Sequence, residues 1–142
     1  RLMDIESYLR RPSLRFSEIN DGNISKQDCI IVDSFGSLSS IYRYGNIAYV
    51  GGGFGKSIHN ILEAAVYSIP IIFGPKYHKF KEAKDLIAVG GAFAVTDDKT
   101  FDALMDELLS NPEKLSKAGE AAGKYVQENS GATLRILNQL PL

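Results

Sequence analysis

Residues 46–67 read NIAYVGGGFGKSIHNILEAAVY and contain the pattern that decides the fold. The apolar residues 47–50 predict a short buried strand, and apolar residues at helical spacing predict a helix over 58–67. Four glycines lie between them, within residues 51–55. A glycine-rich loop between a strand and a helix lets backbone N–H groups approach an anion without side-chain obstruction. The segment therefore predicts a phosphate-binding loop, and a tight turn without a ligand is the alternative.

Two familiar phosphate-binding motifs do not fit the spacing of this loop. The sequence Gly55-Lys56-Ser57 resembles the end of a P-loop, but the first glycine of that motif falls on Val50. The dinucleotide fingerprint requires a third glycine where this chain has Lys56. The loop is therefore interpreted as neither an ATPase P-loop nor a dinucleotide-binding turn.

Strand and helix patterns alternate on both sides of the loop. Continuous apolar runs predict strands at 29–32, 69–73 and 92–95, with a further short strand at 14–16. The run at 29–32 is typical of a strand covered on both faces. Helical spacing predicts helices at 34–44 and 79–89, a helix near the start through Leu2, Ile5, Tyr8 and Leu9, and three helices after residue 96. The first of these three has an apolar stripe of Phe101, Leu104, Met105, Leu108 and Leu109, and the second begins at Pro112. The third follows Gly131 and contains Leu134, Leu137 and Leu140. This order predicts an α/β fold with a Rossmann-like parallel sheet flanked by helices.

Composition narrows the class of protein. The chain has 142 residues, 44% of them hydrophobic, and a net charge of −1, which fits one globular domain spanning 1–142 and does not favour nucleic-acid binding. Its only cysteine, Cys29, lies in an apolar run, so we expect a buried thiol, no internal disulfide and a reducing compartment. No run of about 18 apolar residues is present. Because the chain opens at Arg1 without an initiator methionine, we expect a fragment of a longer protein.

Three polar residues follow the glycine loop, at spacings that place them on one helical face. His59 and Glu63 are four residues apart, and Asn60 and Glu63 are three apart. The Asn60 amide can donate to a phosphate or sugar oxygen, and Glu63 can accept hydrogen bonds from a ribose diol. A solvated glutamate and a capping or surface histidine are the alternatives. The only other histidine is His78, and no acidic cluster accompanies the pair, so we expect no metal site.

A second loop, FGPKYHKF at 73–80, follows the next predicted strand. Ligands of open parallel sheets bind beyond the carboxyl ends of the strands, so both loops are expected at one edge. Lys76 and Lys79 can add positive charge there for an acidic sugar nucleotide, and ordinary surface lysines are the alternative.

Several motifs in unbroken order resemble the carboxy-terminal domain of 3-deoxy-D-manno-octulosonic acid (Kdo) transferases. They are DSFG at 33–36, IY at 41–42, AYVGGG at 48–53, HNILEAA at 59–65, IP at 69–70 and FGP at 73–75. The resemblance implies the C-terminal half of a two-domain GT-B glycosyltransferase that binds CMP-Kdo. The donor-binding residues that it implies, together with those expected above, are Gly52, Gly53, His59, Asn60, Glu63, Gly74, Pro75 and Phe80. Lys56 and Ser57 are not assigned.

The resemblance also implies the reaction of the full-length protein. Kdo would pass from CMP-Kdo to a lipid A precursor in lipopolysaccharide biosynthesis, with neither cofactor nor metal. The amino-terminal domain would bind that acceptor, supply the general base and lie at the cytoplasmic face of the bacterial inner membrane. This fragment would then carry no catalytic residue and be inactive alone. Another GT-B transferase or epimerase using a UDP-sugar, and a non-catalytic nucleotide-binding domain, are the alternatives.

Overall fold

The computed structural model describes residues 5, 7–34 and 36–130. Its chain forms two compact units, Arg1–Ser40 and Ile41–Leu142, and each is described by itself. Within the described residues, no helix has the length and hydrophobicity needed to cross a bilayer. One domain over residues 1–142 stays a prediction.

The first unit contains a two-stranded parallel sheet. Strand β1 (Ser13–Arg15) pairs with β2 (Cys29–Ile31), which confirms both predicted strands, and the short 3₁₀ helices η1 (Phe16–Glu18) and η2 (Ile24–Lys26) lie between them. The backbone N–H and hydroxyl of Ser17 donate to the Asp33 carboxylate at 3.1 and 2.6 Å, and the hydroxyl bond lowers the Asp33 pKa. Ile30 is 48% exposed, and Cys29 is half-buried. The predictions of a strand covered on both faces and of a buried thiol are therefore wrong for this unit.

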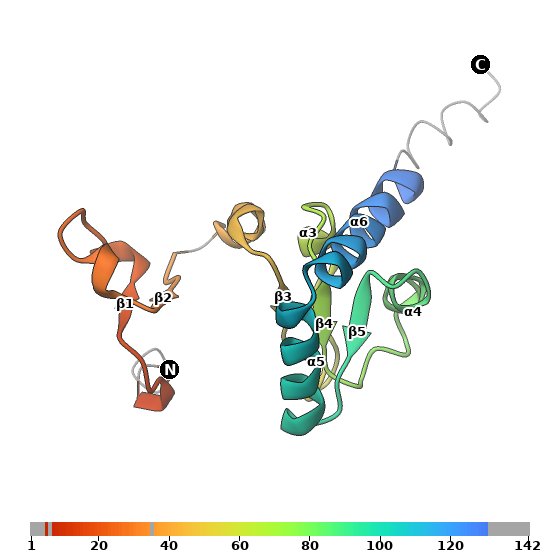
Figure 1. Ribbon diagram of the computed structural model, residues 1–142, viewed down its shortest axis with the longest axis horizontal. Coiled ribbons are helices and arrows are strands. Elements are labelled where there is room, and N and C mark those ends of the chain that lie inside the picture. Colours follow the sequence, from red (N-terminus) through yellow and green to blue (C-terminus); the bar gives the residue numbers. More distant parts are fainter. Residues whose placement is uncertain (1–4, 6, 35, 131–142) are drawn as a thin grey trace, which may run out of the picture. The chain divides into compact units, whose positions relative to one another are not determined.

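The second unit contains a three-stranded parallel sheet in the order β3-β4-β5 (Figure 1). The strands are β3 (Ala48–Val50), β4 (Ile71–Phe73) and β5 (Ala92–Ala94). Val50 lies opposite Phe73, which in turn lies opposite Ala94, so the carboxyl ends of the strands are level. All three predicted strands and their parallel direction are confirmed.

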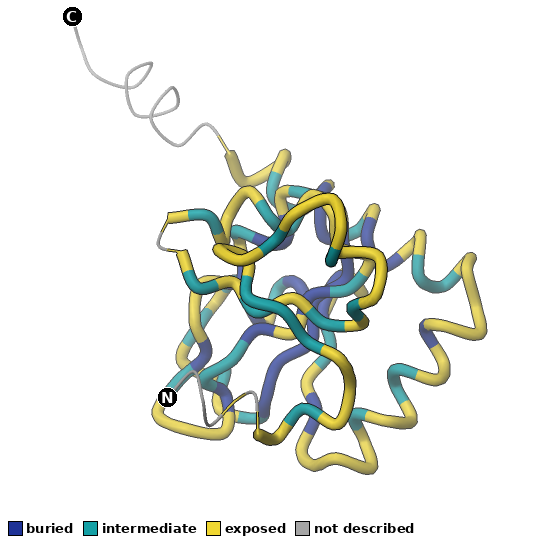
Figure 2. Tube along the Cα trace, turned by 90° about the vertical axis from the view of Figure 1, so that its left-hand side faces the viewer, coloured by how far each residue is buried: buried dark blue, intermediate teal, exposed yellow. Residues whose placement is uncertain are grey.

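Helices cover both faces of this sheet because successive residues of a strand point to opposite sides. Ile71 and Phe73 are fully buried on the face covered by α3 (Leu62–Ala65), α4 (Lys81–Ala88) and α6 (Pro112–Asn129). Ile72 is fully buried on the other face, against Leu108 of α5 (Asp98–Ser110). Figure 2 shows the buried positions gathered along the interior segments, with exposed positions on loops and outer helix faces. The predicted α/β Rossmann-like arrangement is confirmed.

The two long helices begin at capping residues that the sequence supplies. The Asp97 carboxylate accepts a hydrogen bond from the Thr100 N–H at 2.7 Å, and the Thr100 hydroxyl accepts one from the Asp97 N–H at 3.1 Å. Asn111 accepts from the Lys114 N–H at 3.0 Å, and Pro112 occupies the first turn of α6. These two helices confirm the predicted pair, whereas the predicted helix through Leu134 lies outside the described residues.

Two predicted helices are shorter in the structure. The helix expected at 34–44 appears as α2 (Leu38–Ile41) followed by the 3₁₀ helix η3 (Tyr42–Tyr44). The helix expected at 58–67 is only α3, because the N–H of His59 donates to the Gly51 carbonyl and holds residues 58–61 in an irregular path. Four residues at apolar positions of the predicted helices are exposed, namely Leu38, Leu62, Val66 and Leu109. Near the start, residues 5, 7 and 8 are helical, and the rest of that prediction lies outside the described residues.

Candidate functional site

The glycine loop folds back on itself directly after β3. The Gly55 N–H donates to the Gly52 carbonyl at 2.9 Å, and the His59 N–H donates to the Gly51 carbonyl at 3.0 Å. Gly52 has a φ of 92°, and a Cβ atom built there would lie 2.1 Å from the Ser57 carbonyl oxygen. Both the left-handed backbone and this close approach require glycine. Gly51 has open space instead, since a Cβ there meets nothing within 4 Å.

The loops after β3 and β4 lie against each other through their backbones. A Cβ built on Gly53 would lie 2.6 Å from the Gly74 nitrogen, and one built on Gly74 would lie 2.7 Å from the Gly53 carbonyl carbon. The Lys76 N–H donates to the Gly53 carbonyl at 3.0 Å. The predicted second wall is therefore adjacent to the glycine loop, and Gly53 and Gly74 are required by this contact whether or not a ligand is present.

A basic hollow of about 340 Å³ lies between the two loops. Its lining combines three lysines with one histidine, one hydroxyl and one phenyl ring. These residues are Lys56, Ser57, Lys76, His78, Lys79 and Phe80. None of the six is acidic, so the hollow suits an anion. The sequence indicated Lys76, Lys79 and Phe80 separately, but it left Lys56 and Ser57 unassigned because only the folded loop brings them to this wall.

Asn60 and Glu63 form a hydrogen-bonded pair beside the glycine loop. The Asn60 amide donates to Glu63 Oε1 at 3.0 Å, and Asn60 Oδ1 accepts from the Leu62 N–H at 3.1 Å. The prediction that these two side chains share a face is confirmed. Because Asn60 Oδ1 accepts from the Leu62 N–H, the first N–H of α3 is already bonded and is not available to a phosphate.

Tyr42 is a neighbour of this pair that the sequence did not indicate as part of the site. Burial, together with the negative charge of Glu63, raises the Tyr42 pKa. The ring packs against the hydrophobic core. Its distance of 21 residues from Glu63 gave no local signal of the contact.

The remaining predicted site residues occupy the rim of the two loops. The exposed His59 has its ring carbon Cδ2 3.0 Å from a Cβ built on Gly52. Pro75 is half-buried in the loop after β4, and Phe80 lines the hollow while packing against the core. The structure therefore brings all eight predicted residues to the region around the carboxyl ends of β3 and β4.

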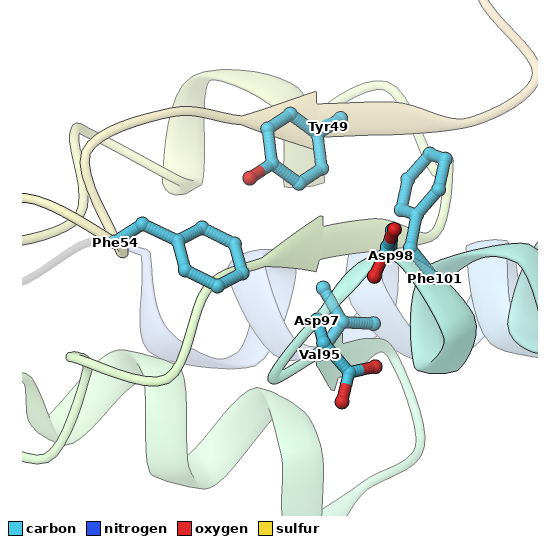
Figure 3. A pocket seen from close by; sticks show the side chains of 6 residues that line it. All are labelled: Tyr49, Phe54, Val95, Asp97, Asp98 and Phe101. Atoms are coloured by element: carbon cyan, nitrogen blue, oxygen red, sulfur yellow. The ribbon is translucent and has the colours of Figure 1, made fainter.

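A second hollow, of about 320 Å³, has an aromatic lining (Figure 3). Tyr49 and Phe101 meet edge to face with ring centroids 5.6 Å apart, and Phe54 of the glycine loop extends into the same space. Two carboxylates, Asp97 and Asp98, also line it. Asp97 caps α5, and the hydrogen bond from the Thr100 N–H lowers its pKa. This hollow is unsuited to an anion, and the sequence did not predict it.

The described histidine, cysteine, aspartate and glutamate side chains do not gather into a metal site. Among the described residues, no group of three or more histidine, cysteine, aspartate or glutamate side chains could hold a metal ion. The expectation of a reaction without metal or cofactor stays a prediction.

Comparison with known proteins places the chain among sequences named 3-deoxy-D-manno-octulosonic acid transferase. It is 37% identical over 106 residues to that of Aquifex aeolicus, covering 71% of this chain and 30% of the relative. It is 33% identical over 115 residues to that of Bordetella pertussis, covering 80% and 27%. It is 35% identical over 113 residues to that of Rickettsia prowazekii, covering 78% and 24%. No protein-family model matches the chain.

Among solved structures, the chain is similar to the C-terminal CMP-Kdo binding domain of WaaA from Acinetobacter baumannii. The TM-score is 0.76 at 24% sequence identity, over 89% of this chain and 66% of that domain. This match confirms the fold, and the sequence matches confirm the resemblance to Kdo transferases. The chain spans 24–30% of the length of the three relatives named above.

Proposed function

We propose that this chain is the donor-binding domain of a Kdo transferase and that it binds CMP-Kdo at the carboxyl edge of β3 and β4. The observation that carries the proposal is the basic hollow lined by Lys56, Lys76 and Lys79. The hydrogen-bonded pair Asn60 and Glu63 follows three residues after Ser57, which also lines the hollow. An acidic sugar joined to a nucleotide by a phosphodiester offers negative charge to the lysines and a ribose diol to the carboxylate. Sequence similarity to named Kdo transferases supports this choice of donor.

The charges of the side chains decide where we propose each part of the donor to bind. The phosphate lies at the basic hollow rather than at the start of α3, because that helix has four residues and its first N–H is already bonded to Asn60. Glu63 would repel a phosphate but can accept hydrogen bonds from the ribose hydroxyls. Asn60 holds the Glu63 carboxylate in position through the bond to Oε1.

In the full-length enzyme, the bond between the anomeric carbon of Kdo and the phosphate oxygen breaks as an acceptor hydroxyl attacks that carbon. CMP leaves with the bonding electron pair, and fixed positive charge in the hollow stabilises the departing phosphate. A general base must take the proton of the acceptor hydroxyl. We assign that base to an amino-terminal domain, since Glu63 is used for the ribose and no residue of this chain is assigned to the acceptor.

The whole protein is proposed to be a two-domain GT-B glycosyltransferase of lipopolysaccharide biosynthesis, with a lipid A precursor as acceptor. The curated relatives are longer than this chain, which leaves room for an acceptor domain. We propose that this domain works at the cytoplasmic face of the inner membrane, where the precursor would be reached.

Titration of the ¹⁵N-labelled chain with CMP tests donor binding. We expect backbone shifts at Gly52, Gly53, Lys56 and Asn60, and weaker competition from UMP than from CMP. Absence of shifts at these residues at millimolar CMP would refute the proposal. Tighter binding of UMP would favour a UDP-sugar enzyme instead.

The Glu63→Gln variant tests the ribose contact. Removing the charged acceptor should weaken CMP binding by about 10-fold to 100-fold, because hydrogen bonds to charged groups contribute about 1.5–3 kcal/mol. Asp106→Asn, an equal change of charge on the exposed surface of α5, is the matched control and should leave affinity unchanged. Equal affinities of the two variants would exclude Glu63 from the site.

A further inference from the structure

We propose that Lys76 is a positioning residue, which locks the glycine loop onto the loop after β4, while Lys56 and Lys79 are the lysines available to an anionic ligand. The part that concerns the ligand rests on the proposed function. The part that concerns the loop rests on contacts within the protein.

Lys76 makes two hydrogen bonds to the glycine loop, one from its backbone and one from its side chain. Its N–H donates to the Gly53 carbonyl at 3.0 Å, and its ammonium group donates to the Gly55 carbonyl at 2.7 Å. Together with the backbone contact between Gly53 and Gly74, these bonds join residues 53–55 to residues 74–76 at three points.

The exposed end of the glycine loop, at Gly55, is the part that the Lys76 side chain holds. Glycine has more backbone freedom to lose on ordering than any other residue, and Gly55 stands at the exposed tip beside Lys56. Its own N–H makes one turn bond, to the Gly52 carbonyl at 2.9 Å. The Lys76 ammonium therefore supplies the bond that ties the tip to a second strand's loop.

The other two lysines of the hollow differ from Lys76. Among the described residues, the side chains of Lys56 and Lys79 make no hydrogen bond or ion pair, although both line the hollow. Their ammonium groups can turn to a ligand without giving up a protein contact. Lys76 instead fixes the wall that carries Lys56, so the hollow is formed before a ligand arrives and binding costs less ordering.

Backbone dynamics of the ligand-free chain test the positioning role. In Lys76→Met, the NMR order parameter of Gly55 should fall from about 0.85 to about 0.6 or lower, the range that separates rigid from flexible backbone. Lys79→Met removes the same charge from the same hollow and should leave Gly55 rigid. Lys76→Arg, which retains a long cationic donor, should restore most of the order. An unchanged Gly55 in Lys76→Met would overturn the inference.

CMP affinity tests whether Lys76 and Lys79 have the different roles that we propose. Lys79→Met should weaken CMP binding by about threefold to tenfold through lost charge alone. Lys76→Met should lose more, because it combines lost charge with a disordered wall, and an equal or smaller loss would contradict the assignment. If the unmodified chain does not bind CMP, the proposed function fails, and the order parameters still decide the role of Lys76.

Discussion

Helix α6 approaches the turn after α3 so closely that two glycines become sensitive to a single methyl group. A Cβ built on Gly119 would lie 2.2 Å from the Ser68 carbonyl oxygen, and one built on Gly123 would lie 2.0 Å from Ser68 Oγ. Ser68 itself has a φ of 55°, which favours glycine. We predict different outcomes for alanine at these two positions when Ser68 is also replaced.

The magnitudes follow from two opposing effects. Alanine in a helix interior is favoured over glycine by about 1 kcal/mol, whereas overpacking costs about 1–3 kcal/mol and more where backbone must move. Cβ contacts below 3.0 Å essentially never occur, so atoms must move at either site. At Gly119 the backbone of α6 or of residue 68 must shift, whereas at Gly123 the Ser68 hydroxyl can turn away. We expect Gly119→Ala to lower the free energy of unfolding by about 2 kcal/mol, and Gly123→Ala by about 1–2 kcal/mol.

Ser68→Gly separates the two cases. It removes the Oγ and Cβ atoms that a methyl group on Gly123 would meet, and it relieves the left-handed backbone. Ser68→Gly with Gly123→Ala should therefore return to within about 0.5 kcal/mol of the unmodified chain. With Gly119→Ala the loss should persist, because the clash is with the carbonyl oxygen of residue 68, which every residue carries.

Urea unfolding followed by far-ultraviolet circular dichroism measures these differences, since the chain has no tryptophan for fluorescence. Gln127→Ala, at an exposed position of α6, is the control for a general effect of alanine on the helix. Equal rescue of both alanine variants by Ser68→Gly would refute the contact geometry, as would stabilisation by Gly119→Ala alone.

Two further predictions concern the glycine loop and the cap of α5. Gly51→Ala should change stability by less than about 0.5 kcal/mol, whereas Gly52→Ala should cost about 2 kcal/mol or more, measured by urea unfolding; equal costs would contradict the loop geometry. Hydrogen bonds from Thr100 lower the Asp97 pKa below 3.8, so this carboxylate stabilises the fold above that value and less as pH falls through its folded pKa. Asp97→Ala should lower the urea midpoint at pH 7 and narrow the difference between pH 7 and pH 2.5; an unaltered difference would exclude the cap as its source.

The sequence predicted those elements whose signals are local. Strand β4 is a continuous apolar run, as expected for a strand buried on both faces, and residues 71–73 are fully buried. Helices α5 and α6 carry their own caps, Asp97 and Asn111, next to an apolar stripe. In each case the residues that form the element also supply the hydrogen bonds or buried surface that stabilise it.

The segment 58–67 shows where local signals fail. Its apolar spacing suits a helix, but the His59 N–H bonds to Gly51 and the Asn60 side chain bonds to the Leu62 N–H, so the helix begins only at Leu62. Both bonds depend on the folded loop, which helical periodicity does not describe. The prediction that Asn60 and Glu63 share a face is still correct, because the two side chains are hydrogen-bonded at a spacing of three residues.

The glycines illustrate why residue type alone could not separate fold from function. Gly52 and Gly53 were interpreted as allowing an anion to approach, yet the Ser57 carbonyl and the Gly74 backbone already require them. A chain with the same glycines but without Lys56 and Lys79 could adopt the same loops, and it would lack the two lysines that we propose to bind the anionic ligand. The proposed anion binding therefore depends on the lysines, and the glycines determine the loop backbone that positions them. Because only the folded loops bring the two lysines to one hollow, the sequence could show their charge but not their common target.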